Sequence, residues 1–189
     1  MRRASTTRTG IDEAALIRRA QQGDQDAFRR IYLANVGDVV AFLARRVDRP
    51  TAEDLAAETF IRAYRQLDRF EWRGVPIRAW LLRIAYRELV AMWRRSSTHE
   101  TPTHSGDLPT SITPSAEDDA TADGLTGETQ AALDALPETQ RLVVELRFLR
   151  DLSVAETAVV LDMTEEAVRA ASYRGMAALR SVLNRAEEP

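Results

Sequence analysis

The sequence predicts an all-α protein: two small helical domains, an N-terminal helical bundle and a C-terminal helix-turn-helix, joined by a flexible acidic linker. Apolar residues recur at the three- and four-residue spacing of amphipathic helices along most of the chain, and no segment alternates as a strand does. Residues 97–127 interrupt this pattern with Ser, Thr, Pro, Gly and acidic residues, a composition typical of a linker. The length of 189 residues suits one or two small domains.

Four helices are expected in the first domain, residues 11–96, behind a disordered tail at residues 1–10. The first spans residues 11–22, before Gly23, and the second spans residues 24–47. A capping-box-like start, Thr51-Ala52-Glu53-Asp54, opens a third helix through Leu67, and Pro76 opens a fourth that ends at Arg95. The side chains expected in the core are Phe28, Ile31, Tyr32, Val36, Val39, Val40, Leu43, Leu55, Phe60, Ala63, Tyr64, Leu67, Trp80, Leu81, Ile84, Ala85 and Leu89.

The second domain, residues 128–187, is expected to hold a helix-turn-helix. Helices at residues 128–136 and 138–149 are separated by Pro137. Ser153 and Glu156 form a capping box for a short helix, and Thr164 caps a last helix that runs to about residue 183. The second helix of such a pair reads base edges in the major groove of DNA. Gly175 inside it predicts the close approach of another helix, because Gly costs stability in a helix interior.

A basic and aromatic block separates the third and fourth helices. Between Phe60 and Arg95 there are nine Arg and three acidic residues, in a chain whose formal net charge is −3. Arg binds phosphate and stacks on bases, and exposed aromatic rings bind unstacked bases. The block therefore indicates a nucleic-acid surface. A helical hairpin with core Trp and a solvated basic face would have the same composition.

The last helix has an inner and an outer side. Val168, Ser172, Gly175 and Leu179 fall on the inner side, and Arg169, Ala170, Tyr173 and Arg174 on the outer side. Arg169 and Arg174 can donate to guanine or phosphate, and Glu165 or Glu166 can accept from cytosine N4. An ordinary amphipathic helix with solvated charges gives a similar pattern.

Several function classes are not supported. With no Cys, the chain has no disulfide, thiolate metal site or cysteine nucleophile, and His99 and His104 lack partners at metal-binding spacing. The acidic groups Asp24/Asp26 and Glu53/Asp54/Glu58 lack an accompanying apolar pocket or nucleophile. We therefore expect no enzyme activity, metal or cofactor. No apolar run reaches the roughly 18 residues of a membrane span, so a soluble, cytoplasmic protein is expected.

These features together resemble the bacterial RNA polymerase sigma factors of the extracytoplasmic-function (ECF) type. The resemblance covers both domains. In the first domain it rests on Gly23-Asp24-x-x-Ala27-Phe28, Asp54-Leu55-x-x-Glu58-Thr59-Phe60-x-Arg62-Ala63-Tyr64 and Ala79-Trp80-Leu81-x-Arg83-Ile84-Ala85. In the second it rests on Leu136-Pro137-x-x-x-Arg141, Leu152-Ser153-x-x-Glu156-x-Ala158, and Val168 with Arg174, Leu179 and Arg180.

The resemblance implies partners and roles. The partners would be core RNA polymerase, promoter DNA and an anti-sigma protein, the last commonly holding family members inactive. Core polymerase would bind the third helix through Asp54, Glu58, Arg62 and Gln66. The downstream promoter element would be captured and melted by Arg69, Phe70, Trp72, Arg73, Trp80, Arg83, Arg87, Arg94 and Arg95. The upstream element would be read as duplex by Glu165, Glu166, Arg169, Ala170, Tyr173 and Arg174. The acidic linker would thread toward the polymerase active centre, although a plain tether explains its composition equally well.

This sequence departs from the family pattern at several positions. Arg87 replaces a usual Asn, and Ala91 replaces an Asp four residues later. Ala57 replaces a Gln and removes one polymerase contact. In the last helix, Ala170 and Ala171 replace hydrogen-bonding residues, which predicts fewer polar base contacts and a thymine-methyl contact from Ala170.

The competing hypothesis is a one-component helix-turn-helix regulator that does not engage polymerase. Such a duplex reader has no use for the aromatic loop at residues 69–72, so binding of single-stranded promoter DNA by residues 1–96 separates the two hypotheses.

Overall fold

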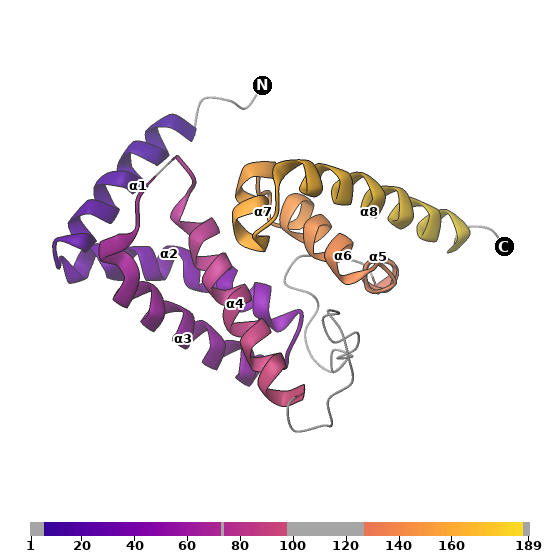
Figure 1. Cartoon of the computed structure of the whole chain (residues 1–189), viewed down its shortest axis with the longest axis horizontal. Helices are drawn as coiled ribbons and strands as arrows, with labels where there is room; N and C mark the ends of the chain where they lie inside the picture. The colour runs from indigo at the N-terminus through magenta and orange to yellow at the C-terminus, as the bar shows by residue number, and fades with distance from the viewer. Residues whose placement is uncertain (1–5, 73, 98–126, 187–189) are drawn as a thin grey trace. The chain divides into compact units, whose positions relative to one another are not determined.

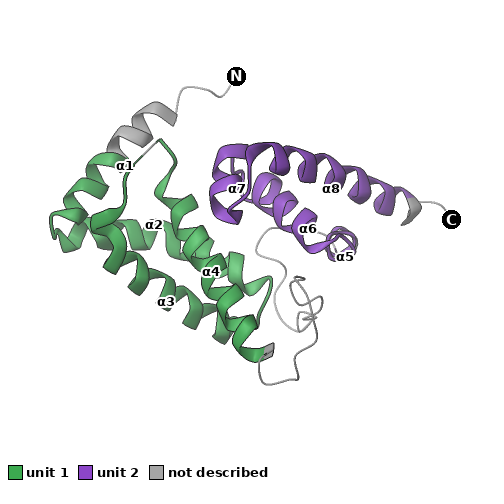
Figure 2. Cartoon of the chain, in the orientation of Figure 1, with its two compact units in different colours: residues 1–115 green, residues 116–189 purple. Residues whose placement is uncertain are grey.

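The computed structural model describes residues 6–72, 74–97 and 127–186, and every regular element in these ranges is helical (Figure 1). The chain divides into two compact units, residues 1–115 and residues 116–189 (Figure 2). The predicted all-α class is confirmed. The first helix begins at Thr6, inside the predicted tail, while residues 1–5 and nearly all of the predicted linker lie outside the described residues.

Four α-helices build the first unit. They are α1 (Thr6–Gln21), α2 (Gln25–Ala44), α3 (Arg49–Gln66) and α4 (Ile77–Ser97), with a 3-10 turn, η1 (Leu67–Arg69), directly after α3. Helix α2 packs against the other three, and α3 also packs against α4. Fully buried apolar side chains fill the space between them; the largest are Ile17, Ile31, Val39, Phe42, Leu43, Ile77, Leu81, Leu82 and Leu89.

Aspartates cap two helices of this unit. Asp24 accepts a hydrogen bond from the Ala27 N–H (3.0 Å) at the start of α2. Asp48 accepts one from the Thr51 N–H (2.8 Å), and α3 therefore begins at Arg49. The predicted capping-box-like start at Thr51 is wrong, because Asp48 supplies the acceptor three residues earlier and Pro50 fits the first helical turn.

The Asp48 cap predicts a pH effect on stability. The backbone hydrogen bond from Thr51 lowers the pKa of Asp48 from its usual 3.8. A lowered folded-state pKa contributes stability above the unfolded-state pKa, and this contribution is lost as the pH falls through the folded-state pKa. Asp48→Asn keeps a hydrogen-bond acceptor but no titrating carboxylate. We therefore expect its free energy of unfolding to fall less than that of wild type below about pH 4. Urea unfolding at neutral and acidic pH measures this. Asp54→Asn, within the same helix, is the control, and equal acid sensitivity of Asp48→Asn and wild type would contradict the prediction.

Two tyrosines predicted in the core are exposed instead. The exposed fractions are 38% for Tyr32 and 53% for Tyr64. The Tyr32 ring packs edge-on against Phe60 (centroids 4.7 Å apart), and the Tyr64 ring packs edge-on against Phe28 (4.9 Å). Both tyrosines therefore cover the α2–α3 contact from outside, an arrangement that leaves the polar end of an amphipathic ring near water.

The second unit is built around its last helix. It comprises α5 (Gly127–Asp134), α6 (Glu138–Val144), a π-helical turn η2 (Glu145–Leu149), α7 (Val154–Leu161) and α8 (Glu165–Ala186). Helix α8 packs against α5, α6 and α7. One apolar cluster joins Val143, Ala158, Val168 and Ala171, and another joins Leu133, Leu136 and Val144.

The predicted turn between α7 and α8 is confirmed. Ser153 and Glu156 form the capping box of α7, and Thr164 accepts from the Ala167 N–H (3.2 Å) at the start of α8. Asp162 takes the left-handed conformation (φ +57°) that ends α7. Gly175 is buried against α6, as its place in a helix predicted. None of the described helices combines the length and the apolar character of a membrane span.

Candidate nucleic-acid interfaces

The two aromatic side chains of the loop between η1 and α4, Phe70 and Trp72, differ in their surroundings. Phe70 leaves η1 in an extended conformation, and its ring packs on Trp80 of α4 with centroids 4.8 Å apart and planes inclined by 47°. Trp72 is 39% exposed. Gly74 has φ +79°, a conformation that suits glycine, and Arg73 lies outside the described residues. The loop thus presents one accessible indole beside a packed Phe70–Trp80 pair.

Helix α1 contacts both ends of this loop. The Gln21 amide donates to the carbonyl oxygens of Leu67 (2.9 Å) and Phe70 (2.7 Å). At the other end, the Glu13 carboxylate accepts from the Ile77 N–H (3.2 Å), the first residue of α4. The sequence prediction missed both side chains. They lie in an ordinary amphipathic helix and no sequence signal marks them; in the structure both side chains are half-buried.

Arginines follow one stripe of α4. Trp80, Arg83, Arg87 and Arg94 recur at intervals of three, four and seven residues, which places them on one side of the helix. Arg87, Arg94 and Arg95 are exposed, as is Arg69 in η1, whereas Arg83 is half-buried. Ala91 lies on this same stripe. The stripe can therefore contact phosphates along the length of α4 without an acidic group at that point.

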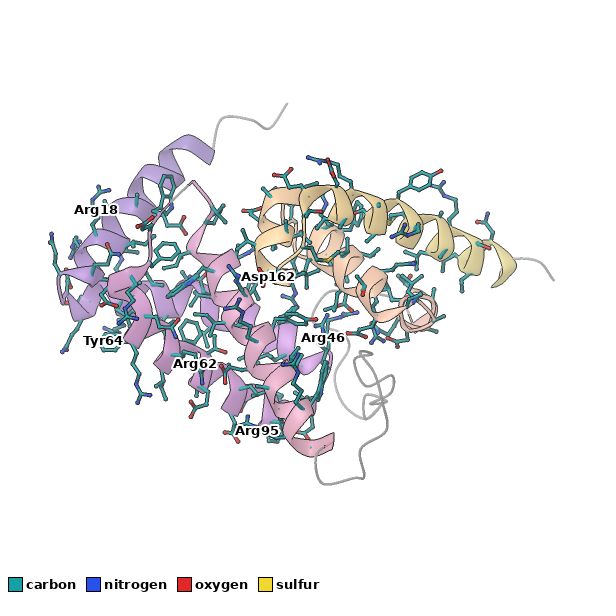
Figure 3. All side chains as sticks on the ribbon, viewed as in Figure 1. Arg18, Arg46, Arg62, Tyr64, Arg95 and Asp162 are labelled. Atoms are coloured by element: carbon teal, nitrogen blue, oxygen red, sulfur yellow. The ribbon has the colours of Figure 1, made fainter. Side chains whose placement is uncertain are left out.

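The four residues predicted to bind polymerase differ in their surroundings. Asp54, Glu58 and Gln66 are exposed on α3. Arg62 also lies there (Figure 3), but it forms an ion pair (2.9 Å) with Glu88 of α4, whose side chain is only 9% exposed. Arg62 therefore neutralises a buried carboxylate, a role that the sequence prediction did not include.

This ion pair predicts a stability effect. We expect Arg62→Met to lower the free energy of unfolding of the first unit by about 1–3 kcal/mol, because it leaves a buried carboxylate without its charged partner. Gln66→Met, one turn further along the exposed side, should change it by less than about 0.5 kcal/mol. Urea unfolding and core-polymerase binding are measured in parallel. Weaker polymerase binding at unchanged stability would show that Arg62 is a contact and not a structural ion pair.

The outer side of α8 carries the residues predicted to read duplex DNA. Glu165, Glu166, Ala170 and Arg174 are exposed, and Tyr173 is 79% exposed. The exposed Arg169 donates to Glu165 (2.5 Å), one helical turn before it. Glu165 thus orients one of the two arginines available for guanine or phosphate. On the inner side Val168 and Gly175 are buried and Ser172 and Leu179 are half-buried, as predicted.

Comparisons with known proteins match both units. A family model described as Sigma-70 region 2 matches residues 31–98, and one described as Sigma-70, region 4 matches residues 132–181. Together they cover more than half of the chain. The ECF RNA polymerase sigma factor BldN of Streptomyces coelicolor is 38% identical over 173 residues. The chain belongs to the ECF sigma factors.

The alignment with BldN covers 89% of this ECF sigma factor. The chain spans only 64% of the length of BldN. The ECF RNA polymerase sigma-E factor of Escherichia coli K12 is 29% identical, with 89% of this chain and 93% of that protein covered.

Two solved structures are also similar. One is CnrH in complex with the cytosolic domain of CnrY, with 25% identity, a TM-score of 0.65, and coverage of 92% of this chain and 97% of that one. The other is the sigma factor RpoE in complex with the anti-sigma factor NepR from Bartonella quintana. It is 20% identical, with a TM-score of 0.62 and coverage of 83% of this chain and 96% of that one. This similarity shows that the two proteins share a fold.

Two of the acidic side chains that could be imagined as acid–base groups, Asp24 and Glu53, have structural partners in this sigma factor. Asp24 accepts from the Arg19 side chain (2.6 Å) and caps α2, and Glu53 pairs with Arg49 (3.0 Å). Within residues 6–72, 74–97 and 127–186, no three His, Cys, Asp or Glu side chains gather as metal ligands would. His99 and His104 lie outside the described residues.

Proposed function

We propose that this ECF sigma factor starts transcription by reading two promoter elements through separate units while α3 binds core RNA polymerase. The supporting observation is an exposed indole, Trp72, in the loop that precedes the arginine-bearing helix α4, in a unit distinct from the helix-turn-helix. A regulator that reads only duplex DNA has no need of such a surface, and the region 2 match disfavours that alternative. In this proposal residues 11–96 act as region 2, residues 97–127 as the linker and residues 128–187 as region 4.

The first unit would bind the downstream element as it melts. Unstacking a base step costs a few kcal/mol, and stacking on an aromatic ring returns about 1–3 kcal/mol per base. Trp72 is the accessible ring, whereas Phe70 and Trp80 would form the supporting wall of the site. Arg69, Arg73, Arg83, Arg87, Arg94 and Arg95 would bind the backbone of the separated strand. With Arg87 in place of Asn, contacts to phosphate or guanine are favoured over those to adenine.

The second unit would read the upstream element through the major groove. Arg169 and Arg174 are the donors for guanine or phosphate, and Tyr173 lies between them in sequence, on the same exposed side. Glu165 and Glu166 can accept from cytosine, and Ala170 can contact a thymine methyl. Because Ala170 and Ala171 carry no hydrogen-bonding groups, the upstream element would be read with few polar base contacts.

Polymerase and an anti-sigma protein would compete for the first unit. Asp54, Glu58 and Gln66, with the exposed part of Arg62, form the proposed docking side of α3. The RpoE–NepR complex provides a precedent for an anti-sigma partner in this fold. A protein that works on RNA polymerase and promoter DNA acts in the bacterial cytoplasm, associated with the nucleoid through the polymerase.

Transcription in vitro over a randomised promoter library tests the proposal. With core polymerase, the wild-type chain should give new RNA start sites that share two sequence elements. Arg174→Ala should reduce discrimination in the upstream element alone by about 5- to 150-fold, since one good arginine–base contact contributes about 1–3 kcal/mol. Arg65→Ala removes the same charge from α3 and should leave upstream selectivity unchanged. Duplex DNA binding without any new start site would overturn the proposal in favour of the one-component regulator.

A further inference from the structure

Helix α1 provides the hydrogen bonds at both ends of the loop that carries Trp72. The Phe70 carbonyl lies directly after η1, and the Leu67 carbonyl already accepts from the Phe70 N–H (3.0 Å) within this turn. Both accept from a single side chain, the amide of Gln21 (2.9 and 2.7 Å). The loop therefore leaves η1 at a point fixed by α1.

Helix α1 also contacts the other end of the loop, where one of its side chains accepts a hydrogen bond instead of donating one. The first N–H groups of α4 also lack partners within the helix, and Ile77 donates its N–H to Glu13 (3.2 Å). A carboxylate at a helix N-terminus is favoured by the helix dipole as well as by the hydrogen bond. Glu13 and Gln21 lie eight residues apart in the sequence, about two helical turns, so one rigid helix sets the distance between the two ends of the loop.

We propose that Gln21 and Glu13 are positioning residues for base selection: α1 fixes the span of the loop so that Trp72 is presented in one orientation to an unstacked base. This inference rests on the proposed function of the loop. Both residues precede residue 31, where the match to region 2 begins. They touch neither the Trp72 ring nor the DNA in this proposal, and they act through the loop backbone. A preorganised site binds its base more tightly and more selectively than a loop that must be ordered on binding.

Gln21→Met is the first test, because Met has a similar length but cannot donate to the two carbonyls. The probe is a fork-junction DNA library whose duplex part is fixed and whose downstream single strand is randomised, bound by holoenzyme assembled from the full chain and core polymerase. We expect base discrimination at one downstream position to fall about tenfold. Core-polymerase affinity and upstream selectivity should not change. Gln22→Met, the exposed neighbouring residue, is the matched control.

The outcomes separate this inference from the proposed function. If wild-type holoenzyme selects no downstream base, the proposed function of the loop fails. If wild type selects a base and Gln21→Met selects it equally well, the positioning role is wrong. A merely structural role would lower core binding and selectivity at every position together, and that result would also overturn the inference.

Glu13 gives an independent measurement with a rescue variant. In the free full-length chain, Glu13→Ala should accelerate hydrogen exchange of the Ile77 amide, measured by NMR. Glu13→Gln keeps an acceptor oxygen and should restore both the slow exchange and the base selectivity. Unchanged exchange in Glu13→Ala, or loss of selectivity in Glu13→Gln as large as in Glu13→Ala, would contradict the positioning role.

Discussion

Replacing Trp72 by Ala should reduce transcription from duplex promoters by about 5- to 150-fold, the equivalent of losing about 1–3 kcal/mol of base stacking. The indole is 39% exposed, so part of the ring is open to an unstacked base. The loss should concentrate in promoter opening, because stacking replaces interactions that a base gives up when it leaves the duplex. The measurement compares a duplex promoter with the same promoter mismatched across the downstream element. Trp72→Ala should be close to wild type on the mismatched template.

Matched substitutions separate stacking from folding in this prediction. Trp72→Phe keeps a smaller ring and should retain part of the activity. Trp93→Phe makes the same change at a buried indole of α4, 8% exposed, and should alter stability without changing the ratio between the two templates. Equal losses of Trp72→Ala on duplex and mismatched templates would show that Trp72 serves polymerase docking or folding and not melting.

The sequence predicted those parts of the fold that depend on local signals. Ser153 and Glu156 specify a capping box within four residues, and the helix they start is confirmed. The start of α3 was misplaced because Thr51 with Asp54 resembles a cap as closely as Asp48 with Pro50 does. Only the actual hydrogen bond, from the Thr51 N–H to Asp48, distinguishes them. Competing caps a few residues apart leave a helix boundary undetermined by sequence.

Side-chain exposure was predictable where a helix has one clear apolar stripe. In α8 the three- and four-residue spacing separated Val168 and Gly175 from Tyr173 and Arg174 correctly. In α2 and α3 the same reasoning placed Tyr32 and Tyr64 in the core. It failed because a tyrosine at the edge of an apolar stripe can cover a neighbouring ring while its hydroxyl stays near water.

The contacts that shape the candidate site were not predictable, because they join residues far apart in the chain. Gln21 and Phe70 are separated by 49 positions, and Glu13 and Ile77 by 64. Nothing near Gln21 marks it as a donor to a distant carbonyl, since a glutamine at a helix end is ordinary. The same holds for the pairing of Arg62 with Glu88. The residue types that bind DNA can be recognised from local sequence, but their supports require the tertiary fold.

Gly175→Ala should destabilise the second unit by about 1–3 kcal/mol, through overpacking against α6. A Cβ at Gly175 would lie 2.7 Å from Val144 Cγ2 and 3.3 Å from the Gln140 carbonyl oxygen. Val144 is only 2% exposed and belongs to an apolar cluster, so its side chain cannot move aside freely. The steric cost should exceed the gain in helix propensity that Ala normally brings. Thermal and urea unfolding of the full chain measure the effect on the second unit.

Gly37→Ala is the matched control, because Gly37 also lies inside a helix but a Cβ there would meet nothing within 4 Å. That variant should stabilise the first unit by about 0.5–1 kcal/mol. A gain in stability from both substitutions would show that α6 and α8 are not in tight contact at Gly175.

Gly175→Ala and Arg174→Ala together separate folding from contact in upstream recognition. Gly175 faces α6 whereas Arg174 is exposed, so Gly175→Ala should weaken upstream-element binding only to the extent that the second unit unfolds. At temperatures well below the thermal unfolding transition, binding of the upstream element by Gly175→Ala should therefore return to the wild-type level. It should stay reduced for Arg174→Ala, because the missing guanidinium is not restored by folding. If cooling rescued Arg174→Ala as well, Arg174 would be a stabilising residue of α8 and not a DNA contact.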